Sequence, residues 1–571
     1  MKKNKIYTLG ICNDEIASAC LFIDGSLVSA ISEERLTRKK YDKSFPIKSI
    51  NYILKENNIK LNRINNIAYS WSKDFNPDLT EKYKKRFAYL KKRSQKELKI
   101  FSDRYKYDFL RDKKNKNQFS LWCKKSLTKK QLKNVNIYYH HEAHAASACL
   151  LSNFNKGLVL TADGRGDFEA LTLSFFNRYQ SKPLKKIYSS TSSDSLGYFY
   201  GRITGLLGFK PMEHEGKVTG LAAHGKHNKA MPLMKKMINV KKGELIASLG
   251  KFYRPFFKPY SRVLRKEISK FSPADIASAA QKHLEECCCK ILMFYLKKFR
   301  LRSTNLMLAG GVFANVKVNH TLKSLKYIKK VFVQPQMNDG GLCIGAAALC
   351  LHKKKIRVKP LKDVFLGPSA DIKKVIILKK KFKKIQIKKY NHIFDQMCND
   401  LSNNKVLGLI RGKMEFGPRA LGNRSIIYKT SDKSINDWLN KRMKRTEFMP
   451  FAPIIRNETA KIAFKDYRQN DPTFYFMTST IKCKKIFIDK CPAVTHVDNT
   501  ARPQVVYKKK DFFLWNLLNK WEKKSGELSL VNTSFNSHGE PIICSEKEAI
   551  IALKNKMIDV LYLDKHRITL N

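Results

Sequence analysis

Short apolar runs separated by polar turns predict a strand-rich beginning to this chain. Residues 6–10 form the first run, and residues 19–23 and 27–31 form two more on either side of Asp24-Gly25. An Asp-Gly pair between apolar runs is a strong signal for a tight hairpin turn. We therefore expect a strand followed by a β-hairpin.

Two later apolar runs each end in an acidic turn that contains glycine. Residues 157–160 precede a turn with Asp163, and residues 331–335 precede a turn with Asp339. Small residues follow Asp339, which is typical of a closely packed helix. A carboxylate on such a turn is a good oxygen ligand for a metal ion.

His140 and His144 stand four positions apart in a stretch rich in alanine. On a helix, this spacing places both imidazoles on one face. An isolated pair of this kind is more often a helix end with histidines that cap it or face solvent. The acidic turn at Asp163 follows closely, and the two features together favour a metal site that combines imidazole and carboxylate ligands.

Two glycine-rich segments predict close approach of the backbone to a ligand. In the first, Glu215 and Lys217 flank a glycine and would orient the ligand, although a surface turn explains the spacing equally well. In the second, Gly310-Gly311 lies between a predicted strand and a helix and is followed by Asn315. Backbone N–H groups at such a helix start suit a phosphate group. The GxxxxGK[ST] pattern of a P-loop is not in the sequence.

The composition changes after a basic segment that we interpret as a linker at residues 356–371. Residues 406–410 read as a strand, and residues 411–425 place arginines on a glycine-proline scaffold that suits bidentate recognition of phosphate. Further cations and polar clusters follow, each after an apolar run. We expect domains at residues 1–355 and 372–571.

The length, composition, net charge and cysteine count limit the class of protein. The 571 residues are too many for one hydrophobic core, and 43% hydrophobic residues argue against wholesale disorder. The net charge of +64 would suit tRNA or an anionic membrane, but the lysines are spread over many segments, which favours compositional bias. Residues 80–135 are strongly basic with interspersed aromatic residues and read as an amphipathic helical insertion. The 13 cysteines form no CxxC pair, so a reducing, cytoplasmic location is expected.

The chain resembles the O-carbamoyltransferase family typified by NodU and CmcH. The resemblance covers nearly the whole chain and rests on ordered motifs: Glu33-Glu34-Arg35, His140-His141-x-x-His144, Ser195-Leu-Gly-Tyr-Phe-Tyr, Glu215-Gly-Lys-Val, Gly310-Gly-Val-x-x-Asn315, Asp339-x-Gly341, Gly417-Pro-Arg-Ala-Leu-Gly-Asn-Arg-Ser425, Pro450-Phe-Ala-Pro453, Val494-Thr-His-Val-Asp498, Thr500-Ala-Arg502 and Asn532-Thr-Ser-Phe-Asn536. In the first turn, Glu15-Ile16-Ala17-Ser18 stands where the family usually has His-Asp-Ala-Ser.

The resemblance implies an N-terminal ASKHA (actin, sugar-kinase and Hsp70-like) α/β domain, similar to the tRNA threonylcarbamoyl-transferase, and a C-terminal YrdC-like α+β domain. It implies that carbamoyl phosphate and ATP form carbamoyl-adenylate in the second domain. The first domain then transfers the carbamoyl group to an acceptor hydroxyl beside Fe²⁺ or another divalent metal, with Mg²⁺ as a further candidate cofactor.

The resemblance also assigns residues to roles. The implied metal ligands are His140, His144, Asp163 and Asp339, and the implied catalytic residues are Glu215, Lys217 and Arg419. The residues implied to bind nucleotide or phosphate are Gly310, Gly311, Asn315, Arg419, Arg424, Lys441, Arg445, Asn532 and Ser534.

Two rival functions stay open at this stage. A tRNA-modifying threonylcarbamoyl-transferase would use the positive charge to bind RNA, and an ATP-gated binding protein like Hsp70 would transfer no group. The arginine motif at 417–425 argues against the first, and the metal constellation argues against the second. The expected partners are a small acceptor with a hydroxyl group, carbamoyl phosphate and ATP. No membrane partner is expected, nucleic acid is the weaker candidate, and both a homodimer and the identity of the acceptor are left open.

Overall fold

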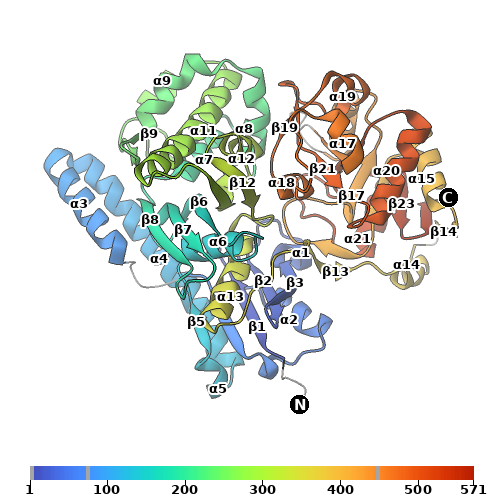
Figure 1. The fold of residues 1–571 in the computed structure, drawn as a ribbon, viewed down its shortest axis with the longest axis horizontal. Helices are drawn as coiled ribbons and strands as arrows, with labels where there is room; N and C mark the ends of the chain where they lie inside the picture. Colours follow the sequence, from blue (N-terminus) through green and yellow to red (C-terminus); the bar gives the residue numbers. More distant parts are fainter. Residues whose placement is uncertain (1–4, 72–76, 383, 445–450, 571) are drawn as a thin grey trace. The chain divides into compact units, whose positions relative to one another are not determined.

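The computed structural model describes residues 5–71, 77–382, 384–444 and 451–570. The chain divides into two compact units (Figure 1). Unit 1 comprises residues 1–33 and 41–362, and unit 2 comprises residues 34–40 and 363–571. The short segment 34–40 therefore belongs to the unit formed by the C-terminal part of the chain, which the sequence did not indicate.

Unit 1 contains two five-stranded sheets with the same internal order. The first has the order β3-β2-β1-β4-β5 and is built from β1 (Tyr7–Cys12), β2 (Ser18–Ile23), β3 (Ser26–Ser32), β4 (Asn66–Tyr69) and β5 (Val135–Ile137). The second has the order β12-β11-β6-β7-β8 and is built from β6 (Lys156–Gly166), β7 (Glu169–Asn177), β8 (Leu184–Thr191), β11 (Thr304–Ala309) and β12 (Ile328–Val333). In each sheet an antiparallel meander is extended by two parallel strands. Unit 1 is thus a mixed α/β structure with a repeated topology.

The predicted first hairpin is formed by β2 and β3. Asp24 and Gly25 both have positive φ angles, of 48° and 75°. Two successive positive φ angles are what a two-residue turn matched to the twist of the strands requires, so the Asp-Gly pair explains this turn.

Two helices lie side by side between the sheets of unit 1 (Figure 1). Helix α6 (His140–Cys149) contacts β6 and β11, whereas α13 (Leu342–Lys353) contacts β1 and β4. Their small residues permit close packing, because a Cβ atom on Gly345 of α13 would lie 1.7 Å from the carbonyl oxygen of Ala143 in α6. The alanine-rich and glycine-rich sequences of these helices are therefore explained by their contact with each other.

Some of the remaining helices of unit 1 contact its sheets. The basic insertion forms α3 (Pro77–Arg93), α4 (Gln95–Ser126) and α5 (Lys129–Leu132), which agrees with the expected helical character of residues 80–135. The other elements are α2 (Ile47–Glu56), α7 (Leu196–Leu206), α8 (Glu215–Leu221), α9 (His227–Met237), β9 (Ile238–Lys241), β10 (Glu244–Ala247), α10 (Arg262–Ile268), α11 (Pro273–Lys298) and α12 (Val316–Lys323). Helix α2 packs on β2 and β3, α7 on β6 and α3 on β8. Among the helices that the structure describes, none is long and apolar enough to cross a membrane.

Unit 2 is built on an eight-stranded mixed sheet with the order β14-β24-β23-β15-β17-β22-β18-β21. Its strands are β14 (Ile385–Lys389), β15 (Leu407–Ile410), β17 (Arg424–Tyr428), β18 (Ala452–Arg456), β21 (Gln504–Val506), β22 (Leu530–Ser534), β23 (Val560–Leu563) and β24 (His566–Leu570). The helices are α14 (Ile372–Lys379), α15 (Ile393–Ser402), α16 (Ile435–Arg442), α17 (Asn457–Ala463), α18 (Pro472–Tyr475), α19 (Lys485–Lys490), α20 (Phe512–Ser525) and α21 (Glu546–Lys554).

The segment expected to be a linker contains regular structure. β13 (Phe365–Ser369) pairs with β16 (Lys413–Glu415) inside unit 2. The glycine-proline pair at 367–368, which suggested a linker, instead lies in a short two-stranded ribbon. The division between the units falls between residues 362 and 363.

Candidate metal centre

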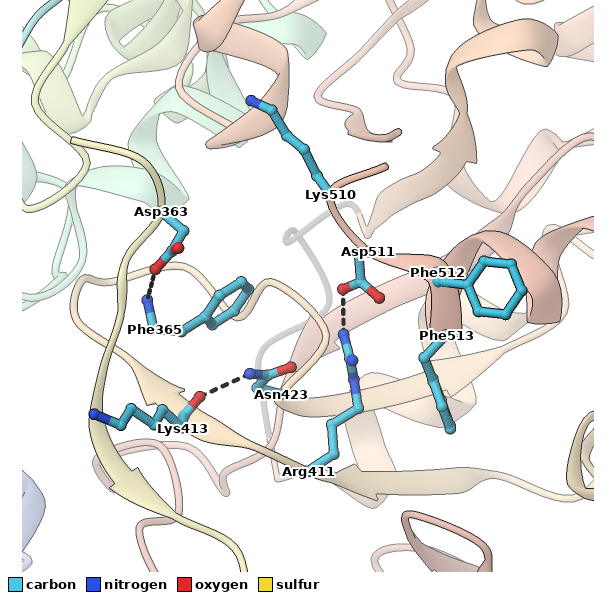
Figure 2. Close-up of a pocket in the computed structure, with 9 residues that line it drawn as sticks. All are labelled: Asp363, Phe365, Arg411, Lys413, Asn423, Lys510, Asp511, Phe512 and Phe513. Atoms are coloured by element: carbon cyan, nitrogen blue, oxygen red, sulfur yellow. Dashed lines mark hydrogen bonds and ion pairs between the residues drawn. The ribbon is translucent and has the colours of Figure 1, made fainter. Parts of the chain in front are cut away.

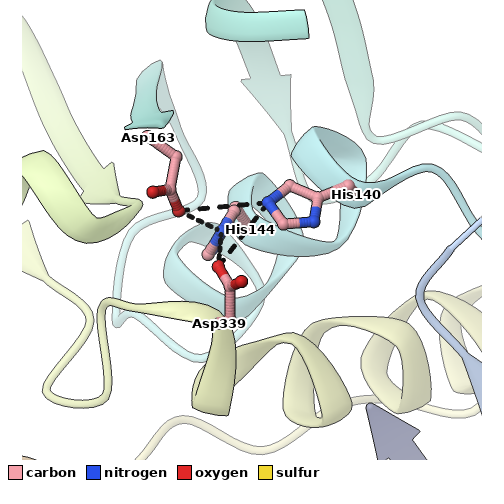
Figure 3. A group of neighbouring side chains, drawn as sticks. All are labelled: His140, His144, Asp163 and Asp339. Atoms are coloured by element: carbon pink, nitrogen blue, oxygen red, sulfur yellow. Dashed lines mark hydrogen bonds and ion pairs between the residues drawn. The ribbon is translucent and has the colours of Figure 1, made fainter. Parts of the chain in front are cut away.

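Four side chains from three separate segments meet inside unit 1 (Figure 3). His140 and His144 lie on α6, Asp163 lies in the β6 segment, and Asp339 lies just before α13. One donor atom from each lies within 4.8 Å of the others. The Nε2 atom of His144 is 3.1 Å from Asp163 Oδ2 and 3.5 Å from Asp339 Oδ1, and the Nε2 atom of His140 is 3.9 and 3.7 Å from the same two oxygens. The structure therefore brings together all four metal ligands that the sequence analysis named.

The turn that carries Asp163 also fixes the helix that carries the histidines. Asp167, four residues after Asp163, accepts a hydrogen bond of 2.6 Å from the backbone N–H of His140. A carboxylate at a helix N-terminus satisfies a free N–H group and complements the helix dipole. One short segment thus supplies an oxygen donor and holds the start of α6 in place.

Glycines give this turn the space that the site needs. A Cβ atom on Gly166 would lie 2.1 Å from the ring of His140, so the imidazole occupies the space of the missing side chain. The backbone N–H of Gly311 donates a 3.2 Å hydrogen bond to Asp163 Oδ2. The Gly310-Gly311 turn, predicted as a phosphate seat, therefore also helps to orient a carboxylate of the quartet.

The pKa values of the four groups are shifted in different directions. Burial lowers the pKa of His140 to about 4, despite the nearby Asp163. Burial also disfavours a charge on His144, but its hydrogen bonds to Asp163 and Asp339 prevail and raise its pKa to about 9. Burial and the charge of Asp163 raise the pKa of Asp339 to about 8, whereas the imidazoles overcome burial and hold the pKa of Asp163 well below its usual range. Such a set can exchange its protons for a cation.

His141, between the two histidines of the quartet, serves a different purpose. Its Nδ1 atom lies 2.7 Å from the hydroxyl of Thr161, which in turn lies 2.7 Å from the hydroxyl of Thr172. The ring is therefore tied to β6 and β7. Of the three histidines in this stretch, only those four positions apart share the face that meets the carboxylates.

A buried network of charged residues lies beside the quartet. The ring of Trp71 lies 4.4 Å from that of His140, measured between centroids, and the guanidinium of Arg165 lies over Trp71 at 5.2 Å. Arg165 forms ion pairs with Asp14 and Asp112. Burial raises the pKa of Asp112 to about 6, although Arg165 opposes this shift. The network connects the first turn of the chain to the ligand helix through an aromatic ring.

Sequence reasoning missed this network, although α4 contained a signal for it. Arg104, Asp108, Asp112 and Asn115 repeat at intervals of four, four and three residues, and all are buried. A polar stripe on the buried face of a helix indicates partners in the protein interior, because buried charges require them. The insertion was expected to be amphipathic and to pack over the core, but that expectation rested on its apolar and aromatic residues and not on this polar stripe.

Glu215 and Lys217 lie on α8, a helix apart from the three segments of the quartet. Lys217 is buried and Glu215 is half-buried, and desolvation raises the pKa of Glu215 to about 6. The Glu215 carboxylate accepts a 2.6 Å hydrogen bond from the backbone of Met212. Asn315 caps α12 by accepting from the backbone N–H groups of Lys317 and Val318. Asn315 therefore has a structural task, whatever else it binds.

The arginine-bearing turn of unit 2 is organised by Glu415. Its carboxylate accepts hydrogen bonds from the backbone N–H groups of Leu421, Asn423 and Arg424, at 2.7, 2.8 and 3.2 Å. Gly417 and Gly422 provide the positive φ angles, of 150° and 98°. This scaffold presents Arg419.

Arg419 and Arg424 have different surroundings in this turn. Arg424 is buried and donates to the carbonyl oxygens of Arg411, Asn423 and Pro368. Arg419 lies close to Arg502, whose pKa is lowered well below its usual value by burial and by the charge of Arg419. Two neighbouring guanidinium groups suit an anion, and Arg502 was not among the predicted site residues, although its Thr-Ala-Arg motif was noted.

The other predicted binding residues of unit 2 differ in how far they are exposed to solvent. Asn532 is buried and donates to Ala420 and Gln504, so it supports the arginine turn from β22. Ser534 is half-buried at the end of β22, and Lys441 is exposed in the last turn of α16. Arg445 lies outside the described residues.

A separate pocket of about 390 Å³ lies in unit 2 (Figure 2). Arg411 and Asp511 form an ion pair in its wall, and Asp511 also caps α20. The remaining lining residues are Asp363, Phe365, Lys413, Asn423, Lys510, Phe512 and Phe513. None of the predicted nucleotide-binding residues that the structure describes lines this pocket.

Comparison with known proteins gives the same family over both units. Residues 8–348 match the carbamoyltransferase N-terminus model, and residues 398–569 match the carbamoyltransferase C-terminus model. An uncharacterized protein of Methanocaldococcus jannaschii is 32% identical, over 98% of this chain and 99% of its own length. Nodulation protein NolNO of Sinorhizobium fredii is 30% identical, over 96% of this chain and 78% of its own. Among solved structures, T. kodakarensis HypF is 13% identical with a TM-score of 0.33, over 62% of this chain and 48% of its own. Because the two family models together match most of its length, the chain belongs to the carbamoyltransferase family and is a transferase enzyme.

Proposed function

We propose that this enzyme is an ATP-dependent O-carbamoyltransferase that works in two steps. In the first, carbamoyl phosphate, ATP and water give carbamoyl-adenylate, pyrophosphate and phosphate in unit 2, which we take to be YrdC-like. In the second, unit 1, which we take to be ASKHA-like, transfers the carbamoyl group to an acceptor hydroxyl and releases AMP. The observation that carries the proposal is the quartet of His140, His144, Asp163 and Asp339 in a chain of this family.

The donor set fits a divalent metal ion. Ligand atoms about 2.0–2.2 Å from one ion lie up to about 4.4 Å apart, and the observed spacing needs only a small contraction to reach this range. Two imidazoles with two carboxylates suit Fe²⁺, Mn²⁺ or Zn²⁺ better than Mg²⁺ or Ca²⁺, which prefer oxygen ligands. When bound, the ion would act as a Lewis acid toward a carbonyl or phosphate oxygen.

The residues around the quartet would hold the reacting groups in place. The Gly310-Gly311 turn would act through the quartet, because the N–H of Gly311 donates to Asp163 Oδ2 and the N–H of Gly310 donates to the carbonyl oxygen of Met337. Lys217 would neutralise negative charge on the nucleotide, and Glu215 would orient Lys217 or the acceptor. The buried network through Arg165 and Trp71 would keep the ring of His140 from turning.

In unit 2, Arg419 would grip the phosphate of carbamoyl phosphate. A guanidinium donates two parallel hydrogen bonds to a phosphate, whereas an ammonium group cannot reproduce that geometry. Arg502 lies close enough to Arg419 for their charges to interact. An anion between them would relieve this repulsion, so the pair is suited to bind one. Arg424 and Asn532 would support the turn without contacting the substrate.

The proposal is tested by assaying the two steps separately with the full-length chain. Pyrophosphate release from ATP should require carbamoyl phosphate, and AMP release with carbamate formation should require a hydroxyl acceptor and a divalent metal. Pyrophosphate release without carbamoyl phosphate would contradict the first step. Transfer that survives complete removal of metal by a chelator would contradict the assignment of the quartet.

A further inference from the structure

Helix α4 presents an apolar and basic face to solvent. Phe109, Leu110 and Leu121 are 45%, 55% and 54% exposed. Lys106, Lys113 and Lys124 are also exposed and stand three or four positions from these apolar residues. Residues at these spacings lie on one side of a helix. We call these six residues the outer face of α4.

The opposite side of α4 packs into the core of unit 1 and so holds the helix in place. Ile100, Phe101, Phe119 and Trp122 are buried there, together with the polar stripe that reaches Arg165. Phe119 stacks on Tyr69 with 4.0 Å between ring centroids, which fastens α4 to the first sheet. The outer face contributes little to this core. Three large exposed apolar side chains along one helix face therefore indicate a binding surface.

The charge around this face is predominantly positive, with Asp103 as an exposed acidic residue three positions before Lys106. In residues 77–126 lysine and arginine outnumber aspartate and glutamate by nearly three to one. The acidic residues Asp108 and Asp112 point to the buried side, where arginines pair with them. Within the part of the chain that the structure describes, the ion pairs do not include Lys106, Lys113 or Lys124. Helix α3 adds further lysines and arginines beside α4 (Figure 1).

We propose that the outer face of α4 binds the surface of an anionic phospholipid bilayer. Lysines would contact the lipid phosphates, while Phe109, Leu110 and Leu121 would enter the region between headgroups and acyl chains. A helix with lysines around exposed leucine and phenylalanine is suited to lie in that interface. The sequence analysis named no membrane partner, and the exposed apolar residues within the basic insertion are the observation that changes this.

The apolar residues favour a bilayer over a nucleic acid. An RNA or DNA ligand would use the lysines, but it gains little from leucine, which neither stacks on a base nor contacts a phosphate. Two of the three apolar residues are leucines, about three helical turns apart. A bilayer uses both kinds of side chain, because each has a matching layer in the lipid interface.

The test is co-sedimentation of the full-length chain with lipid vesicles. The chain should bind vesicles with equal parts of phosphatidylglycerol and phosphatidylcholine, and should not bind vesicles of phosphatidylcholine alone. A lysine near an anionic surface contributes about fivefold to binding, so K106Q/K113Q/K124Q should weaken binding roughly a hundredfold. L110S/L121S should weaken it at least tenfold at unchanged charge.

Two matched controls make the result specific. K381Q/K388Q/K389Q removes the same charge from exposed lysines of unit 2, and I376S/I377S removes two exposed apolar residues of α14 there. Neither should change vesicle binding by more than about twofold, because both lie outside the basic insertion. Circular dichroism and carbamoyl-phosphate-dependent pyrophosphate release should be unchanged in all four variants, which separates failure of this proposal from failure of the proposed function.

Three outcomes would overturn the proposal. The first is equal binding to both kinds of vesicle, or to neither. The second is loss of binding in the unit 2 controls with normal binding in the α4 variants. The third is binding to duplex RNA of random sequence that depends on the three lysines but not on Leu110 and Leu121, with no binding to vesicles.

Discussion

The two candidate sites of this enzyme are built in contrasting ways. In unit 1, the four donor groups converge on one point, and a separate contact fixes each of the segments around His140 and Asp163. In unit 2, the predicted residues divide among buried supports, a half-buried arginine pair and an exposed lysine. The first group of side chains is already gathered within 4.8 Å, whereas the second shows mainly the scaffold around Arg419.

The difference matches the ligands that we propose for the two sites. A metal ion is small and needs donors on all sides, so its site must be assembled by the fold from distant segments. A phosphate is larger and can be held from one side by a few cations and N–H groups. Substitutions near the quartet should therefore act through geometry, and those near Arg419 should act through charge and hydrogen bonds.

The largest effect is expected from His144→Ala. His144 has the shortest contacts to both carboxylates, at 3.1 and 3.5 Å. Its loss should abolish metal binding and carbamoyl transfer. Changes to residues that only support metal ligands lower metal affinity or activity roughly 10–100-fold, and the loss of a ligand should exceed that. Pyrophosphate release in the first step should persist. Metal content by mass spectrometry and separate assays of the two steps measure this.

His141→Gln is the matched control for that variant. The residue lies in the same helix and is equally buried, but its ring is bonded to Thr161. Metal content should stay normal. If His141→Gln lost metal while His144→Ala kept it, the ligand assignment on α6 would be wrong.

Gly166→Ala tests whether the geometry of the quartet is set by its packing. A Cβ atom there would lie 2.1 Å from the His140 ring, so either the ring or the turn must move. We expect metal affinity to fall roughly 10–100-fold and stability to fall by about 1–3 kcal/mol. Metal titration and thermal denaturation of the metal-free chain measure the two effects.

Gly164→Ala supplies the comparison within the same turn. A Cβ atom at Gly164 would meet only Tyr198, at 4.0 Å, which is ordinary contact. Metal affinity should change by less than about threefold. Equal losses of metal affinity in the two variants would show that the turn tolerates a side chain at neither position. The contact with His140 would then not explain the effect of Gly166→Ala.

These contacts also show how far the sequence alone could reach. The histidine spacing and the acidic turns were sufficient to name four residues that the fold brings together, because helix and strand periodicity place side chains in a known way. The buried polar stripe of α4 indicates partners in the interior, but the sequence could not identify them, since the Trp71–Arg165 network joins α4, the first turn and β6, which are distant in sequence. The interpretation of residues 356–371 as a linker rested on a glycine-proline pair, usually a turn signal, and part of that segment forms β13.

In unit 2 the sequence identified the arginine motif but could not divide its roles. Arg419 and Arg424 are the same residue type in one short turn, and only tertiary contacts distinguish them. Arg424 donates to the backbone carbonyl oxygens of Arg411, Asn423 and Pro368. The repeated strand order of unit 1 could not be predicted from its first hairpin, because long helical segments stand between β4 and β5 and between β8 and β11.

Arg419→Lys should have an intermediate effect, confined to the first step. The substitution keeps the charge but removes the two-pronged geometry. Removing a charged hydrogen bond to an anion costs about 1.5–3 kcal/mol, so kcat/KM for carbamoyl phosphate should fall roughly tenfold to a hundredfold. Transfer from pre-made carbamoyl-adenylate should be nearly unchanged. Loss of transfer with normal adenylate formation would place Arg419 at the acceptor instead.

Arg424→Lys should lower stability more than catalysis. Lysine cannot reach the carbonyl oxygens of Arg411, Asn423 and Pro368 at once. The loss of these bonds should cost about 1–3 kcal/mol, or several degrees in Tm for a unit of this size. Thermal denaturation and first-step kinetics on the surviving folded protein test this. A hundredfold loss of kcat/KM at unchanged Tm would move Arg424 into direct contact with substrate.

The smallest effect is expected from Lys441→Gln. Lys441 was predicted to bind an anion together with Arg419, but its side chain is exposed in the last turn of α16. Exposed charges interact through water and are screened by salt, so each contributes about 0.2–1 kcal/mol. The KM for carbamoyl phosphate should therefore rise by less than about fivefold, and the difference from the unaltered enzyme should vanish at high ionic strength. Arg419→Lys, by contrast, should keep its defect at any salt concentration, because a bonded guanidinium in a half-buried turn is shielded from mobile ions. If the Lys441→Gln defect were as large as that of Arg419→Lys and equally independent of salt, Lys441 would be enclosed when substrate binds. The open arrangement of unit 2 would then describe only the enzyme without its ligand, and its contrast with the metal quartet would disappear in the working complex.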